Sequence, residues 1–203
     1  MAVGDGMRQR AALILEKFAR RDQREPMAFW AVELPDNERE QAQLAEAFDR
    51  HGVELFNRGD AQGALDASWP NFLLRLKIVQ RQPADRSAIR DFASAEDLMG
   101  LACIELDKLD IAEQMLSEAL TYRRGLFQDD PSDAHAANLY GAALNHMGRL
   151  EHAKGNVAPA LAYFSQARDH LLEVDRRWSG VSFIEMELAE AVERLAAIGK
   201  DHQ

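Results

Sequence analysis

The side chains best suited to chemistry are six histidines, one cysteine and several acidic pairs. His146 and His152 lie six residues apart and would project from different faces of a helix, and no histidine pair is spaced by four with a third ligand. The lone Cys103 excludes a cysteine-rich zinc site and an intrachain disulfide, and its place on a packing face predicts a buried thiol. The acidic pairs fall on expected helix edges or turns, as in Glu38/Glu40, Asp129/Asp130 and Glu185/Glu187. We therefore predict no metal site and no catalytic residue.

Sequence motifs for nucleotide or acyl chemistry are also absent from the chain. It contains no GxGxxG, GxxxxGK or GxSxG pattern. An enzyme would have to build its site from residues that no motif singles out, so we predict a non-enzymatic protein without a cofactor.

One stripe of polar residues is better suited to binding than to catalysis. Asn138, Asn145 and His152 are spaced by seven, and Arg149 follows Asn145 by four, with the small Ala142 between them. Asparagine can both donate to and accept from a peptide backbone, and arginine can hold a carboxylate with two parallel hydrogen bonds. The stripe predicts a peptide-binding face, with a merely solvated helix face as the alternative.

The elements that would position this stripe repeat along the chain with a period of 48 residues. The period relates Gly52, Gly100 and Gly148, then Ala64, Ala112 and Ala160, then Ser68, Leu116 and Phe164, and also Pro83 and Pro131. Within each repeat the apolar spacing is helical, and Gly155-Asn156 predicts a helix stop followed by a cap. Each repeat is therefore expected to be a pair of antiparallel helices, with Gly148 facing Ala160 and Phe164 filling the space beside it.

The expected helices lie near 6–22, 37–57, 62–82, 86–106, 109–128, 133–154, 157–177 and 181–198. The last is the first half of a fourth, unfinished repeat. Pro70 should kink or split the helix that contains it, because proline removes a backbone hydrogen bond. Residues 26–35 are apolar and bounded by prolines, and we expect a short helix or a docked linker there.

This pattern resembles the tetratricopeptide repeat (TPR) family, and the extra 14 residues per repeat resemble the long-helix repeats of kinesin light chains and related adaptors. The resemblance covers roughly residues 37–200 and is best in the third copy, at Met147/Gly148/Gly155/Asn156/Ala160/Leu161/Phe164/Ala167. It implies an all-α, right-handed α-solenoid of about three 48-residue units plus a terminal helix. The domain organisation follows: residues 1–35 form an N-terminal amphipathic helix and apolar linker, and residues 36–203 form the repeat domain.

The resemblance also implies that the first helix of each pair lines a concave groove that grips a peptide or helix. The residues expected to line it are Asp49, Val53, Phe56, Asn57, Asp97, Leu101, Ile104, Asn138, Asn145, Arg149 and His152. Acidic residues flank apolar ones in the first two repeats, which suits a partner helix with apolar and basic residues. Asp49 stands where a clamp for C-terminal carboxylates would need a lysine, which disfavours a chaperone-tail receptor.

One candidate ligand is part of the chain itself. Residues 7–21, MRQRAALILEKFARR, read as an amphipathic helix with a basic rim. This segment either docks into its own groove or a neighbour's, or caps the first repeat. The sequence leaves both open.

The net charge of −10 argues against sequence-independent binding of nucleic acid. With one cysteine and no apolar run long enough for a membrane span, we expect a cytoplasmic protein that binds no membrane. The favoured function is an adaptor that binds another protein. The alternatives are a small acidic TPR chaperone for a secreted or assembly-prone client, and a structural assembly module in which the unfinished fourth repeat makes a homodimer.

Overall fold

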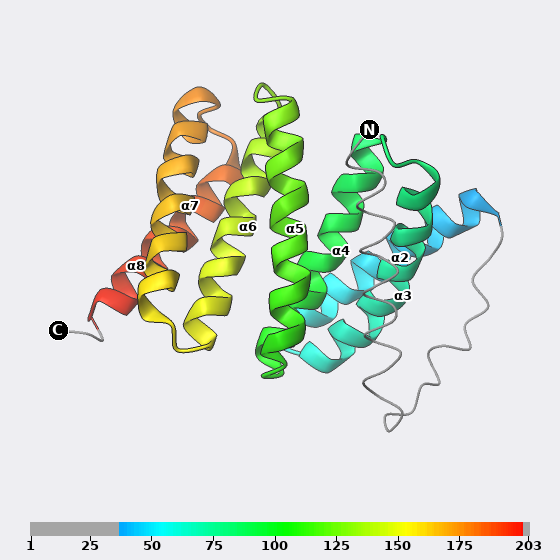
Figure 1. Cartoon of the computed structure of the whole chain (residues 1–203), viewed down its shortest axis with the longest axis horizontal. Helices are drawn as coiled ribbons and strands as arrows, with labels where there is room; N and C mark the ends of the chain where they lie inside the picture. The colour runs from blue at the N-terminus through cyan, green and yellow to red at the C-terminus, as the bar shows by residue number, and fades with distance from the viewer. Residues whose placement is uncertain (1–36, 201–203) are drawn as a thin grey trace. The chain divides into compact units, whose positions relative to one another are not determined.

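The computed structural model describes residues 37–200, with side chains through residue 198. This range contains seven α-helices and no strand: α2 (Glu38–Asn57), α3 (Ala61–Arg81), α4 (Arg86–Glu105), α5 (Leu109–Asp129), α6 (Ala134–Ala153), α7 (Val157–Arg177) and α8 (Ser182–Lys200) (Figure 1). The all-α prediction is confirmed, with successive helices packed as adjacent pairs in a solenoid-like manner. The predicted helix near 6–22 and the apolar segment 26–35 lie outside the described residues.

The chain divides into two compact units, residues 1–98 and 99–203, with the boundary inside α4. We call them the N-terminal and C-terminal units and describe each by itself. The N-terminal unit holds α2, α3 and α4 up to Leu98. The C-terminal unit holds the rest of α4 and α5 to α8.

In the N-terminal unit, α2 and α3 pack against each other as a helical pair. Asn37 caps α2 by accepting from the backbone N–H groups of Arg39 and Glu40, and Asp60 caps α3 by accepting from that of Gly63 at 2.8 Å. Phe72 is fully buried, with ring centroids 5.7 Å from Trp69 and 5.2 Å from Phe92. These contacts tie the middle of α3 to α4.

Pro70 lies inside α3, which continues through it as a single helix. Of the two predicted outcomes, the split is therefore wrong, and the kink stays a prediction. Pro70 is buried between turns that also bury Phe72 and Leu74 completely. Burial of these large side chains outweighs the one backbone hydrogen bond that proline removes.

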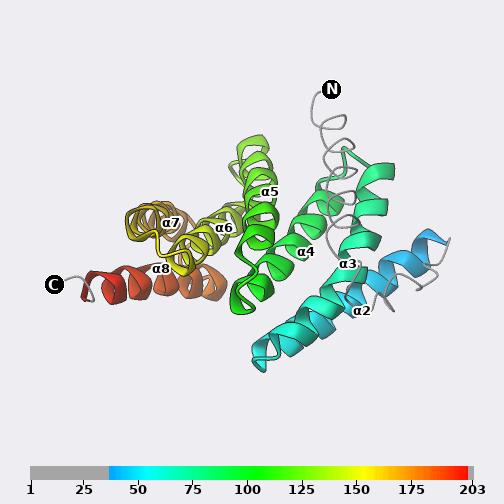
Figure 2. The same cartoon turned by 60° about the horizontal axis from the view of Figure 1, so that its bottom comes forward.

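In the C-terminal unit, α6 packs against both α5 and α7, and α8 packs against α6 and α7. In Figure 1, α8 runs behind α7 and α6, and Figure 2 shows it below them. Two apolar clusters hold α8 in place. Ile184 packs with Ala137 and Val174, and Ile198 packs with Ala160 and Phe164.

The turn within each helix pair contains one residue in the left-handed region, and these residues are 48 apart. They are Gly59 (φ 81°), Asp107 (φ 55°) and Gly155 (φ 77°). Glycine adopts this conformation without strain, which confirms the predicted helix stop at Gly155. Asn156 occupies the N-cap position of α7, but the prediction that its side chain caps the helix is wrong. Its Nδ2 donates to Glu151 Oε2 at 2.8 Å instead.

The repeated glycines mark the close approach of the two helices in each pair. A Cβ on Gly100 would lie 2.5 Å from Leu116, and one on Gly148 would lie 2.7 Å from Phe164. A Cβ on Gly52 would lie 3.2 Å from Ser68 Oγ and 3.0 Å from Leu98. Each glycine therefore meets the residue 16 positions later. The nearest side chain to Gly148 is Phe164 rather than the predicted Ala160.

Candidate partner-binding site

A ladder of alternating charges crosses the first helices of successive pairs in the C-terminal unit. Arg149 of α6 reaches Glu105 of α4 through Nη2 at 3.3 Å, and Glu190 of α8 through Nη1 at 4.0 Å. Arg194 of α8 reaches the same Glu190 oxygen at 3.6 Å. We call Glu105, Arg149, Glu190 and Arg194 the Arg149 ladder. It lies on the helices that the repeat pattern assigns to a groove.

The acidic members of the ladder are more accessible than the arginine between them. Glu105 exposes 52% of its side chain and Glu190 30%, whereas Arg149 exposes 18%. Ile104 is half-buried next to Glu105, and His152 is exposed one turn beyond Arg149. An approaching chain would therefore meet carboxylates first, with Ile104 as the apolar contact beside them.

Two predicted ligand-binding residues on α6 are instead buried in the fold. Asn145 is fully buried, and its Nδ2 donates to the Glu187 backbone oxygen at 2.9 Å and to Glu187 Oε2 at 3.2 Å. Asn138 is 5% exposed. The prediction that these asparagines face an open groove is wrong, because α8 packs on α6 and covers this part of the stripe. Asn145 does donate to a backbone carbonyl, but this carbonyl belongs to α8 of the same chain and not to a ligand.

Two predicted groove residues on α4 are also unavailable. Asp97 and Leu101 each expose 9% of their surface. Both belong to the buried part of α4, so the prediction that they line an open surface is wrong as well. An acidic and an apolar residue are what the predicted groove required at these positions, but both side chains are buried in the packing of α4.

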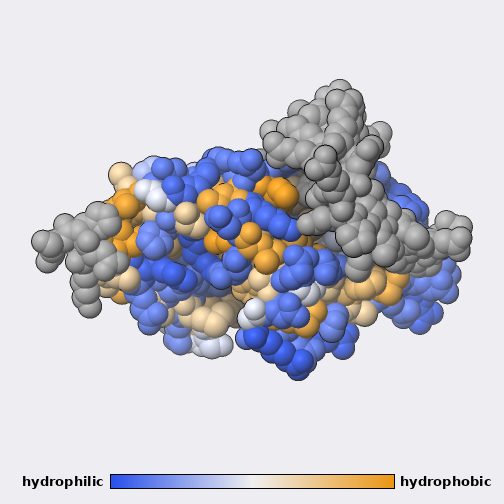
Figure 3. Space-filling model, turned by 90° about the horizontal axis from the view of Figure 1, so that it is seen from below, coloured by the Kyte–Doolittle hydropathy of each residue, from blue (hydrophilic) through white to orange (hydrophobic). Residues whose placement is uncertain are grey.

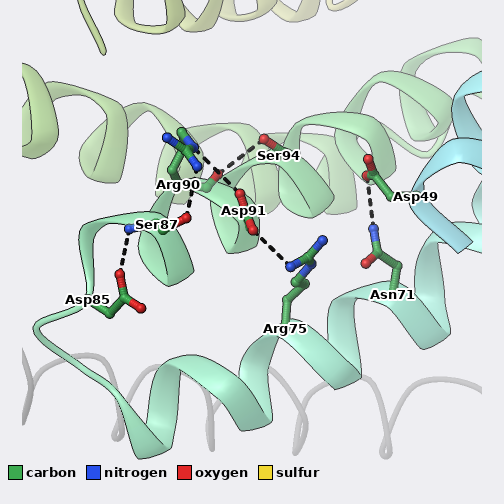
Figure 4. A network of polar contacts seen from close by, with 8 residues as sticks. All are labelled: Asp49, Asn71, Arg75, Asp85, Ser87, Arg90, Asp91 and Ser94. Carbon is green, nitrogen blue, oxygen red and sulfur yellow. Dashed lines mark hydrogen bonds and ion pairs between the residues drawn. The ribbon is translucent and has the colours of Figure 1, made fainter. Parts of the chain in front are cut away.

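In the N-terminal unit, the predicted Asp49 is part of a network of polar contacts (Figure 4). Asn71 Nδ2 donates to Asp49 Oδ1 at 3.1 Å, and Arg75 Nη1 donates to Asp91 Oδ2 at 2.8 Å. Arg90 Nε lies 3.5 Å from the other Asp91 oxygen. The network joins α2, α3 and α4, so its first role is to hold the three helices together.

Burial raises the pKa of the Asp49 carboxyl above its usual range. The Arg75 charge and the Asn71 donor act in the opposite direction, and the nearby Asp91 and Glu46 charges add to the rise. The carboxylate form of Asp49 is therefore less favoured than it would be in water.

Three predicted residues near the end of α2 remain accessible. Val53 is 42% exposed, Asn57 is exposed and Phe56 is half-buried. They lie within the last two turns of the helix, which bring an apolar pair next to an amide. Val53 and Asn57 are thus more exposed than Asp49, which is partly buried.

The sequence reasoning missed the partners of the predicted residues. Arg75 and Asp91 were not singled out, and Glu187 was considered only as one of an acidic pair on a helix edge, although each meets a polar group on another helix. Arg75 and Asp91 belong to α3 and α4, 16 residues apart, a separation that carries no signal by itself. Glu190 meets Arg149 across 41 residues of sequence, a contact that no local spacing indicates.

The side chains most capable of chemistry, Cys103 and His170, are packed within the fold. Cys103 is fully buried, and burial raises the pKa of its thiol to about 11. His170 lies edge-on to Phe127 and Tyr140 at 5.1 and 5.0 Å, and its Nε2 is 2.8 Å from the Ala137 carbonyl oxygen. Within residues 37–198, no three histidine, cysteine or acidic side chains gather as a metal ion would require.

On the face shown in Figure 3, hydrophilic residues predominate and hydrophobic ones form separate patches among them. No helix in the described part of the chain combines the length and apolarity needed to cross a bilayer.

In comparisons with known proteins, the chain matches no protein-family model. No curated protein shows significant sequence similarity to it either. The resemblance to TPR proteins therefore stays an expectation drawn from the repeated residues.

Proposed function

We propose that this protein is a non-enzymatic adaptor of the TPR type that binds a peptide or amphipathic helix of another protein. The observation that carries the proposal is the Arg149 ladder. It lies on α4 and α6, the first helices of two successive pairs, and on α8, the equivalent helix of the unfinished repeat, where an array of helix pairs would present its inner surface. The ladder joins these helices and also leaves two carboxylates open to a ligand.

The chemistry of the ladder selects for a partner with basic and apolar residues. A lysine or arginine of the partner would pair with Glu105 or Glu190, which expose 52% and 30% of their side chains. An apolar partner residue would cover the half-buried Ile104. Because such exposed ion pairs are screened by salt, binding should weaken as ionic strength rises.

Arg149 has a different part in this proposal from the one that the sequence suggested. It already contacts two carboxylates of its own chain, so it is not free to hold one from a ligand. Its role is to keep Glu105 and Glu190 close together at the surface, where like charges would otherwise repel.

The test is a quantitative pull-down from cell extract that compares the wild type with a Glu105→Lys/Glu190→Lys variant. The control variant is Asp169→Lys/Glu173→Lys, which makes the same charge change at exposed positions of α7, outside the ladder. All three chains must first unfold at the same denaturant concentration.

A protein retained by the wild type and by the control, but lost by the ladder variant, would support the proposal. Purified with the wild type, it should bind more weakly at higher salt. If the ladder and control variants retain the same proteins, the ladder is not the binding site.

A further inference from the structure

Helix α8 has a second apolar face that the other described residues leave exposed. Its inner face buries Ile184, Ala191 and Ile198 almost completely. On the other side, Met186 is 65% exposed and Val192 47% exposed. Of the four large hydrophobic residues exposed in the described part of the chain, three belong to α8, including Phe183 at 38%. Apolar side chains exposed together on one side of a helix call for a partner, because such patches mark interaction surfaces.

The shape and charge of this surface narrow the choice of partner. We define the α8 outer face as Met186, Ala189, Val192 and Ala196, with the exposed Glu185 and Glu193 beside them. The two alanines leave room for another helix to approach closely. From Ser182 to Ile198, α8 carries four glutamates and one arginine. The outer face therefore suits an apolar helix with basic edges, and two such faces would bring acids against acids if they met directly.

The chain contains a segment of that chemistry in residues 7–21. This segment has five basic residues and one acidic residue around Leu13, Ile14, Leu15 and Phe18. As a helix it would be about 22 Å long, and α8 with its 19 residues is about 28 Å long. Charge, apolar content and length are thus complementary between residues 7–21 and α8.

We propose that the α8 outer face binds residues 7–21 of a second copy of this chain. Each copy contributes one basic segment and one acidic face, so a two-fold pair has two identical contacts and closes on itself. The pairing uses a different surface from the Arg149 ladder and does not depend on the proposed adaptor function.

The test is the molar mass of the full chain in solution, measured by light scattering over a range of concentrations. The wild type should be a dimer. Met186→Glu/Val192→Glu should raise the dimer Kd at least 100-fold, and so should Leu13→Glu/Phe18→Glu. The control, Ala162→Glu/Gln166→Glu, adds the same charge to exposed positions of α7 and should leave the dimer unchanged.

Charge reversal distinguishes this contact from a general loss of folding or solubility. Glu185→Lys/Glu193→Lys and Arg10→Glu/Lys17→Glu should each weaken the dimer, whereas the chain that carries all four changes should regain it. A wild type that stays monomeric, whether or not its own segment occupies the face, would overturn the proposal. So would a dimer that survives Met186→Glu/Val192→Glu, since it must then form through another surface.

Discussion

Gly148 lies directly against the ring of Phe164, so that an added Cβ would be 2.7 Å from Phe164 Cε1. Phe164 is completely buried, so its ring lies among closely packed neighbours. The missing side chain of one residue and the bulk of the other together set how closely α6 approaches α7. Gly100 and Leu116 repeat this relationship 48 residues earlier.

We expect Gly148→Ala to lower the free energy of unfolding by about 1–3 kcal/mol, because the new methyl group overpacks against a rigid ring. The measurement is equilibrium unfolding in denaturant. Gly125→Ala is the matched control: Gly125 lies in α5 with nothing within 4 Å of its Cβ position. There the greater helix propensity of alanine should stabilise by up to about 1 kcal/mol. Equal effects at both sites would show that the Phe164 contact imposes no constraint.

Asp107→Gly should stabilise the protein by about 0.5–1 kcal/mol. Asp107 has a φ of 55°, a left-handed conformation that strains a side-chain-bearing residue and that glycine adopts freely. The equivalent positions 59 and 155 are already glycine. The opposite change, Gly155→Ala, should destabilise the protein, because it places a side chain on a residue with a φ of 77°. The measurement is the midpoint temperature of thermal unfolding of both variants. Two shifts of the same sign would contradict this account of the turns.

Cys103 should resist modification by a thiol reagent at pH 8 in the folded protein and react at once after denaturation, since the thiol is buried. Its raised pKa of about 11 also has a consequence for stability. The unfolded thiol loses its proton near pH 9 and the folded one only near 11, so unfolding becomes easier as pH rises through this window. The slope of the unfolding free energy between pH 9 and 11 should therefore be smaller in Cys103→Ala. An unchanged slope would rule the thiol out as its source.

Asp49→Asn should be more stable than the wild type at pH 7. The pKa of Asp49 is raised mainly by burial, so its carboxyl contributes most below its ordinary pKa of 3.8, and this contribution is lost as pH rises. The advantage of the amide should shrink as pH falls towards 3.8. Asp66→Asn, at an exposed position of α3, makes the same charge change as a control. A destabilised Asp49→Asn at pH 7 would mean that the attraction between the Asp49 carboxylate and the Arg75 charge outweighs the cost of burial.

Asn145→Ala should lower the free energy of unfolding by about 1–3 kcal/mol, because it removes two hydrogen bonds between α6 and α8 in a buried site. Amide hydrogen exchange should quicken most in α8. The exposed His152→Ala should change stability by less than about 0.5 kcal/mol. If Asn145→Ala leaves exchange in α8 unaltered, Asn145 does not anchor that helix.

The position and length of the helices could be predicted from the sequence because their signals are local. Pro83 and Pro131 lie between pairs, and Gly59 and Gly155 end the first helices within pairs through their positive φ. These signals depend on a few neighbouring residues, so they need no knowledge of the rest of the fold. Pro70 shows where local signals fail. Its type allowed α3 to be split there, but the burial of Phe72 and Leu74 keeps α3 a single helix.

The candidate site was only partly predictable. The 48-residue repeat indicated which helix faces would form the site, and the side chains of Ile104, Arg149 and His152 on those faces are at least partly exposed. Whether Asn145 faces solvent depends on Glu187, 42 residues away, and the neighbours of Arg149 lie 44 and 41 residues away in either direction. By itself, therefore, the sequence determined the helices, their pairing and the residue types on each face. Only the tertiary structure decided which of those residues a packed neighbour covers, because burial and ion pairing arise from contacts between helices that no local spacing encodes.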